Sequence, residues 1–269
     1  DCSHVEEITV EANPDDVADE WVAQLAATQV NRVSLGVQSF DDGVLKFMNR
    51  RHDADTARKA YCILEKAGIR NISIDLIFGL PQLSDQQWKE TLKNALEISS
   101  CGLPPKHISA YQLSVEPGSM LAKMVDKGLW NEASDELCEH QYAMLCETLS
   151  EAGYHHYEIS NFARPGYEAV HNSAYWRHVP YVGLGPGAHS FHMSAGTPER
   201  SWNRPDLQAY LADPACVREY ESLDEEQMTL EKIMLALRTS EGISASYLKE
   251  HCDSGSLSHA LASGNLVCL

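Results

Sequence analysis

The sequence predicts an α/β fold built on a partial (β/α) barrel, with an α+β region towards the C-terminus. Three observations support this prediction. Short apolar segments alternate with helix-length segments, which is the rhythm of parallel βα units. Three apolar segments close on the polar residues Glu11, Gln38 and Asp75, and a weaker fourth closes on Gln112. After Pro117 the rhythm changes to one long helix and short segments rich in glycine and aromatic residues.

The N-terminal elements follow from alternation and from stop signals. The expected elements, in chain order, are a strand at 8–11, a helix at about 16–27, a strand at 33–38, a helix holding Val44, Leu45 and Met48, a helix at about 55–67, a strand at 72–76, a helix from about 84 to 99 and a strand at 108–113. Pro14 stops the first strand, and Gly36 lets another group approach the second closely. Gly68 caps the third helix, while Ser84 and Gln87 form a capping box.

Only four βα units are visible, whereas a closed eight-stranded barrel needs roughly 250 residues for itself. The connections between strands are long enough for crossover helices, so the strands should be parallel. A partial barrel that lacks its first strands therefore fits the pattern best.

The C-terminal region begins with a long helix at about 134–152, ended by Gly153. The segments YHHYEIS, HNSAYW and YVGLGPGAHSF are expected to form mostly antiparallel strands and loops. Ser222 and Glu225 match a capping box that opens a final helical part. The expected domains are a partial barrel (1–118), a helix with short strands and loops that complete the core (119–220), and a small helical appendage (221–269).

The formal net charge of −18 argues against nucleic-acid partners and against anionic membrane surfaces. No apolar run is long enough to span a bilayer, so no stable membrane insertion is expected. Arg50, Arg51 and His52 form a small local basic group. The abrupt start at Asp1, without an initiator Met or a leader, predicts that part of the native protein is missing.

Eight cysteines occur without any CxxC or CxxxCxxC spacing, so no zinc or cluster site is predicted in this chain. Cys62, Cys138 and Cys146 fall within helical patterns. Reduced thiols of a cytoplasmic protein are therefore expected rather than a disulfide framework.

The polar strand ends predict one ligand site. Carboxylates such as Glu11 and Asp75 accept hydrogen bonds from ammonium and hydroxyl groups, and the amide of Gln38 both donates and accepts. The Arg50 guanidinium could donate two parallel hydrogen bonds to a carboxylate. The set suits an amino acid linked to a nucleoside. Taken singly, each residue could also be a solvated strand end or, for Arg50, part of a surface ion pair.

A second candidate group comprises His171, Asn172, Tyr175 and Trp176. It could stack on a flat ring and offer an imidazole to iron or to a carboxylate. The alternative is a loop that Trp176 anchors in the core. The nearby GLGPGAH segment lacks the strand–GxGxxG–helix context of a dinucleotide site and indicates a tight turn.

Eight motifs, in a consistent order, carry a family resemblance over most of the chain: EANP, SLGVQSF, NRRH, SIDLIFGLP, YQLSVEPGS, YEISNFARPGY, HNSAYW and GLGPGAHSF. With them the sequence resembles the radical S-adenosylmethionine (SAM) family of oxygen-independent coproporphyrinogen III oxidase. Within that family, the HNxxYW pattern is similar to the heme chaperone branch.

The resemblance implies a partial barrel of the radical SAM type and assigns SAM contacts to Glu11, Gln38, Arg50 and Asp75. It associates His171 and its neighbours with heme. The family's CxxxCxxC loop, whose thiolates hold a [4Fe–4S] cluster, is absent from this chain. The chain is therefore expected to be a fragment without cluster or radical activity, although the full-length protein should carry both cluster and SAM.

Three functions remain open at this point. The first is a heme-binding protein that passes heme to an acceptor protein. The second is an enzyme that oxidatively decarboxylates two propionates of coproporphyrinogen III, with a deoxyadenosyl radical abstracting hydrogen. The third is a barrel-like binding module without radical chemistry, for which weak SAM binding is expected.

Overall fold

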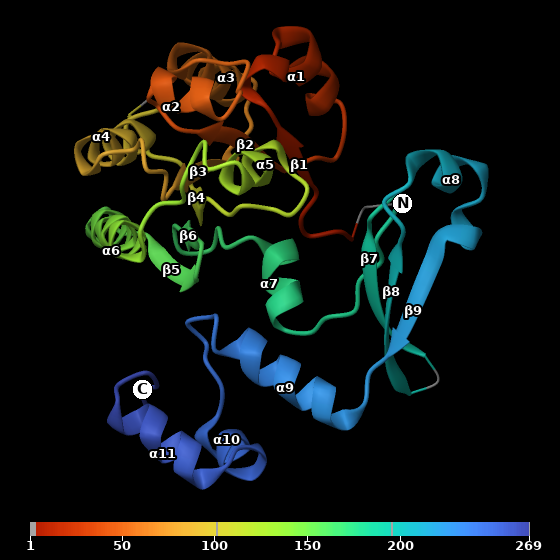
Figure 1. The fold of residues 1–269 in the computed structure, drawn as a ribbon. Helices are drawn as coiled ribbons and strands as arrows, with labels where there is room; N and C mark the ends of the chain where they lie inside the picture. Colours follow the sequence, from red (N-terminus) through yellow and green to blue (C-terminus); the bar gives the residue numbers. More distant parts are fainter. Residues whose placement is uncertain (1–3, 101, 195, 269) are drawn as a thin grey trace. The chain divides into compact units, whose positions relative to one another are not determined.

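The computed structural model describes residues 4–100, 102–194 and 196–268. The chain divides into two compact units, Asp1–Glu168 and Ala169–Leu269 (Figure 1). This division falls inside the region expected at 119–220, so the three expected domains stay a prediction.

The first unit is built on one six-stranded sheet with the order β1-β2-β3-β4-β6-β5. Its strands are β1 Thr9–Ala12, β2 Arg32–Gln38, β3 Asn71–Phe78, β4 His107–Gln112, β5 His155–Glu158 and β6 Asn161–Ala163. Strands β1 to β4 are parallel, as the repeated βα pattern predicts, while β6 runs antiparallel to β4 and β5 antiparallel to β6. The hairpin after the long helix thus extends the parallel sheet.

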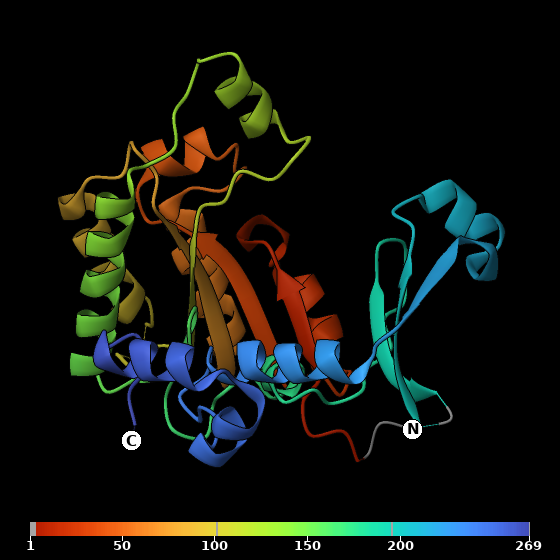
Figure 2. The same ribbon diagram turned by 60° about the horizontal axis from the view of Figure 1, so that its bottom comes forward.

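Helices of the first unit cover one face of this sheet (Figure 2). The helical elements of this unit are a 3-10 turn at Pro14–Asp16, α1 Asp19–Ala26, α2 Asp42–Phe47, α3 Ala54–Lys66, α4 Asp85–Leu96, α5 Met120–Asp126 and α6 Asp135–Glu151. Of these, α1, α3, α4 and α6 contribute most to the core, whereas α5 buries no residue. The predicted capping box of Ser84 and Gln87 opens α4. Helix α5 was missed by sequence analysis, although Ser119 caps it.

Alternation along the strands separates an apolar face from a polar one. Leu35, Ile74 and Ile108 belong to the core beneath the helices and are fully buried. The residues between them, such as Ser34 and Ser109, point to the opposite face, because successive side chains of a strand alternate. The sequence period of two therefore places a polar row on the face that the helices leave free.

Within residues 169–194 and 196–268, the second unit contains a three-stranded antiparallel sheet and five α-helices. The elements are α7 Val170–Trp176, β7 His189–Ser194, β8 Thr197–Asn203, α8 Leu207–Ala212, a 3-10 turn at Pro214–Val217, β9 Arg218–Ser222, α9 Glu225–Ala236, α10 Ala245–His251 and α11 Ser254–Ala262. In the glycine-rich segment, a Cβ on Gly183 would lie 2.0 Å from the carbonyl oxygen of His189. The expected tight turn with close packing is present there.

Two expectations for this unit are wrong. HNSAYW forms most of helix α7, where strands and loops were expected. Its aromatic residues favour strands, but His171 and Tyr175 are four residues apart and meet on one helical face. The helix ends beside His178, which has a positive φ of 55°. The capping box before α9 is formed by Asp224 and Gln227, two residues beyond the expected pair.

Across the described segments, no helix is long and apolar enough to cross a membrane. The six cysteines within these segments are free, while Cys2 and Cys101 lie outside the described residues.

Candidate functional site

A polar row crosses the first unit's sheet, with one residue from each strand in the order of the strands. Its members are Glu11 of β1, Ser34 of β2, Asp75 of β3, Ser109 of β4, Asn161 of β6 and Glu158 of β5. The strand register pairs Glu11 with Ser34, Asp75 with Ser109, and Ser109 with Asn161. We call this set the polar row.

Asp75 is the centre of the polar row. The Ser34 hydroxyl donates to both carboxylate oxygens, at 3.0 and 3.3 Å, and Ser109 hydrogen-bonds the same carboxylate from the other side. Burial raises the pKa of Asp75 to about 6; the hydrogen bonds from the two serines oppose this rise, and the Glu11 carboxylate adds to it. At neutral pH Asp75 is therefore mostly ionised, within reach of protonation in mildly acidic solution.

Arg32 of β2 is a buried basic residue on the same face of the sheet as Asp75. Its side chain is 5% exposed, and its Nε has no hydrogen-bond partner among the described residues. Burial, helped by the charge of Arg32, lowers the pKa of His107 to about 3. That ring is therefore neutral, and it bonds the Ser73 hydroxyl at 2.7 Å and the Tyr157 hydroxyl at 2.8 Å. His107 thus acts as a structural crosslink of the polar face.

Gln38 occupies an irregular position at the end of β2. Its φ is +66°, which is uncommon for a residue other than glycine, and the register between β2 and β3 shifts just before it. A Cβ on Gly36 would lie 2.9 Å from the Gln38 Nε2 and 3.8 Å from the Asn13 Oδ1. Gly36 therefore leaves space for the Gln38 amide beside the C-terminal end of β1. A strained backbone of this kind is frequent at binding sites.

The basic group after α2 separates into structural residues and one unengaged cation. Arg51 pairs with Asp15 at 2.8 Å, and the His52 ring bonds the Val37 carbonyl at 3.0 Å. These two side chains fasten the loop to neighbouring elements. Arg50 is partly exposed, and no hydrogen bond or ion pair engages its guanidinium within the described segments. The basic pocket suggested by three adjacent residues is thus reduced to Arg50.

The chemistry of these side chains fits the amino acid and nucleoside parts of SAM. Glu11 is exposed, Asp75 is partly buried and Gln38 is buried. The two carboxylate acceptors and the amide therefore differ in their exposure to solvent. Ser34 links Glu11 and Asp75, because it is the register partner of Glu11 and donates to the Asp75 carboxylate at 3.0 Å. The assignment of all four residues to SAM stays a prediction.

The described residues form no site that fits an iron–sulfur cluster. Its eight cysteines contain no CxxxCxxC spacing, and within residues 4–100, 102–194 and 196–268 no group of three or more His, Cys, Asp or Glu could hold a metal ion.

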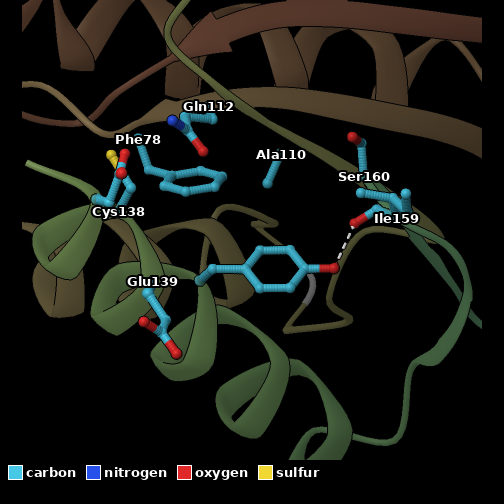
Figure 3. Close-up of a pocket in the computed structure, with 9 residues that line it drawn as sticks. Phe78, Ala110, Gln112, Cys138, Glu139, Ile159 and Ser160 are labelled. Carbon is cyan, nitrogen blue, oxygen red and sulfur yellow. Dashed lines mark hydrogen bonds between the residues drawn. The ribbon is translucent and has the colours of Figure 1, made fainter. Parts of the chain in front are cut away.

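Gln112 lies away from the polar row. It lines a pocket of about 530 Å³ between α6 and the sheet, together with Phe78, Ala110, Cys138 and Tyr142 (Figure 3). Its grouping with the other strand ends was therefore wrong, because Gln112 shares the helix-covered face with Ala110. The preceding residue, Tyr111, lies on the face of Asp75 and hydrogen-bonds Ser109 and Asn161.

Helix α7 in the second unit carries the other candidate group. The Tyr175 hydroxyl lies 2.9 Å from His171 Nε2, with the two rings edge to face at 4.9 Å. Tyr175 also meets Tyr181 edge to face at 4.6 Å. His171 and Tyr175 are both exposed. They form a small aromatic surface with an accessible imidazole.

Trp176 belongs to a different environment. The guanidinium of Arg238 lies 5.1 Å from the centre of its ring, and its buried Nε1 has no hydrogen-bond partner among the described residues. Trp176 is only partly buried, so the anchoring alternative and the binding one both stay predictions for this group. Asn172, between them in sequence, is partly exposed.

Comparisons with known proteins agree with this architecture. Residues 2–95 match the model of the radical SAM superfamily. The chain is 36% identical to the heme chaperone HemW of Lactococcus lactis over 90% of this chain and 62% of that protein. It is 35% identical to the heme chaperone HemW of Synechocystis, over 88% of this chain and 57% of that protein.

A mitochondrial relative and a solved structure extend the comparison. The radical S-adenosyl methionine domain-containing protein 1 of Danio rerio is 32% identical over 90% of this chain and 55% of its own length. The structure described as coproporphyrinogen III oxidase (HemN) from Escherichia coli, a radical SAM enzyme, matches with a TM-score of 0.74. It is 19% identical, and the match covers 96% of this chain and 63% of that one, so it shows the fold alone.

The chain spans about three fifths of the length of the curated relatives it matches. The predicted fold class and the predicted family are both confirmed, and the family implies SAM and a [4Fe–4S] cluster in the full-length protein. Residues 2–95 thus carry a radical SAM domain, and over about nine tenths of its length the chain is similar to heme chaperones.

Proposed function

We propose that the protein containing this chain is a radical SAM heme chaperone, which binds heme and passes it to an acceptor protein. The observation that carries the proposal is sequence identity of 33 to 36% with bacterial heme chaperones over about nine tenths of this chain. We also propose a cytoplasmic location for this protein.

The two units would supply different parts of this function. In the first, Glu11 and Asp75 would accept from the amine and hydroxyl groups of SAM, and Arg50 would bind its carboxylate. When bound together with the cluster, SAM supplies one-electron chemistry. Gln38, fixed by its turn and by the space at Gly36, would orient the cofactor.

In the second unit, His171 on α7 would offer an imidazole to the heme iron while Tyr175 packs beside the macrocycle. The hydrogen bond between the two side chains would orient the ring. Trp176, held by Arg238, would keep the helix in place.

The test is a hemin titration of the full-length protein, reconstituted anaerobically with its cluster. A saturable Soret band with one heme per chain, followed by loss of that band to an apo-acceptor, supports the chaperone. Absence of a heme band on the cluster-loaded protein would reject it.

The alternative is an oxygen-independent coproporphyrinogen III oxidase, which the E. coli structure favours at the level of the fold. The same preparation, given SAM, a reductant and coproporphyrinogen III, separates the two functions. Vinyl-bearing product would establish the oxidase. No turnover together with heme transfer would leave the chaperone.

A further inference from the structure

Asp75 receives hydrogen bonds from the strands on both sides of β3. Ser34 on β2 donates to its two carboxylate oxygens at 3.0 and 3.3 Å, and Ser109 on β4 bonds it as the register partner of Asp75. Both serines are buried, at 8% and 4% exposure, while Asp75 keeps part of its side chain accessible. Two buried serines thus flank the partly accessible carboxylate of Asp75.

We propose that Ser34 and Ser109 are positioning residues for SAM binding, which hold the Asp75 carboxylate as an oriented anion ready for the cofactor. The inference rests on the proposed function, namely that Asp75 contacts SAM. Neither serine was singled out by the sequence, because an isolated Ser in a strand carries no signal of its partner.

The physical reason is that burial opposes the anion that the site needs. Burial raises the pKa of Asp75 to about 6, and the two serine hydroxyls hold it from rising further. A hydrogen bond to the charged form favours that form. Loss of either donor should therefore raise this pKa towards neutrality and leave the carboxylate free to turn.

Charged and titratable groups from the neighbouring strands act on the same carboxylate. Glu11 of β1 raises the pKa of Asp75, and Arg32 of β2 lowers it. Tyr111 of β4 faces it from the other side, and burial, first among several causes, raises the pKa of that phenol. The tyrosine is therefore neutral across the range in which Asp75 titrates, so Asp75 and its serines set the pH dependence there.

The experiment measures SAM affinity by calorimetry on the full-length, cluster-loaded protein between pH 5.5 and 8.5. In wild type, affinity should fall as the pH drops through about 6, the pKa of Asp75. Ser34→Ala should weaken binding at pH 7 by roughly tenfold and move the midpoint up by about one unit, since hydrogen bonds to charged groups are strong. Ser109→Ala should act in the same direction.

The matched control is Ser73→Ala. Ser73 is a fully buried serine on the same strand and the same face as Asp75, but its hydroxyl bonds His107 at 2.7 Å. This variant should leave the midpoint of the pH profile where it is in wild type. Circular dichroism establishes that each variant is folded, and Ser109→Ala serves where Ser34→Ala does not fold.

The outcomes are distinguishable. If wild type does not bind SAM, the proposed function fails and the inference with it. If wild type binds and Asp75→Asn binds equally well, the inference is overturned together with the SAM contact of Asp75, while the heme-chaperone proposal stands. If both serine variants keep the wild-type midpoint, the inference alone is overturned. An upward shift in the serine variants but not in Ser73→Ala supports it.

Discussion

The polar row and helix α7 position their candidate residues in different ways. Asp75 lies in the middle of a six-stranded sheet, where neighbouring strands fix it through Ser34 and Ser109. His171 lies on a seven-residue helix and is oriented by Tyr175 of the same turn. The first arrangement depends on contacts distant in sequence and the second on a local one. The sheet therefore gives a partly buried site whose charge the neighbouring strands tune, and the helix gives an exposed one.

The two units also differ in how completely they bury their large apolar side chains. The first unit buries large side chains completely, with Trp88, Leu92 and Phe162 each no more than 1% exposed. Helix α9 of the second unit leaves Leu230 and Met234 more than half exposed. Stability is thus concentrated around the sheet that carries Asp75.

The largest effect should come from the core of the first unit. Trp88→Ala is expected to lower the free energy of unfolding by about 3–5 kcal/mol, because it leaves a cavity and removes the bond from Nε1 to the Gln141 carbonyl. Denaturant titration measures this. Leu230→Ala on α9 is the control and should change stability by less than about 0.5 kcal/mol. Equal losses would refute the contrast between the units.

Asp75→Asn should separate binding from stability. A carboxyl whose pKa is raised from 3.8 to about 6 binds its proton more tightly when folded, so stability falls as the pH rises from about 4 to about 6 and stays lower above that. The variant should lose SAM binding yet gain roughly 1–3 kcal/mol of unfolding free energy at pH 7.5, and nothing at pH 3.5. Denaturant titrations at both pH values check this. A loss of stability at pH 7.5 would contradict it.

His171→Ala should act on heme alone. We expect hemin affinity to fall by about tenfold, which corresponds to roughly 1.4 kcal/mol, with SAM affinity unchanged. Tyr175→Phe keeps the ring and removes the hydroxyl that bonds His171, so a smaller loss is expected. Absorbance titration gives both values. If Asp75→Asn weakened hemin binding as strongly as His171→Ala, the division of labour would be wrong.

The smallest effect tests a local feature that the sequence predicts. Ser84→Ala removes the N-cap of α4, because the Ser84 hydroxyl accepts from the backbone N–H of Gln87 at 3.3 Å, and should cost about 1 kcal/mol. Ser84→Asp keeps an acceptor at the same place and should be nearly neutral. Thermal unfolding of both variants at one pH checks the difference, and equal melting temperatures would contradict it.

Local signals predicted much of the fold. The alternation of apolar and polar residues predicted strands β1 to β4, and capping residues predicted one end each of α3, α4 and α6. The prediction was wrong where local preference competes with packing. HNSAYW contains residues that favour strands, yet its i, i+4 pair and the lack of a Pro or Gly let it form α7. At β4 the strand was placed correctly, but Gln112 and not Tyr111 was assigned to the ligand face.

The sequence by itself determined that polar residues end the parallel strands, and family motifs marked Glu11, Gln38, Arg50 and Asp75 as a set. Only the tertiary structure decided which groups act on Asp75. Ser34 and Ser109 are 41 and 34 residues away from it, and Arg32 gives no sign in the sequence that it is buried. The physical reason is that periodicity fixes the face on which a side chain lies, whereas strand register and packing fix its neighbours, its burial and hence its charge.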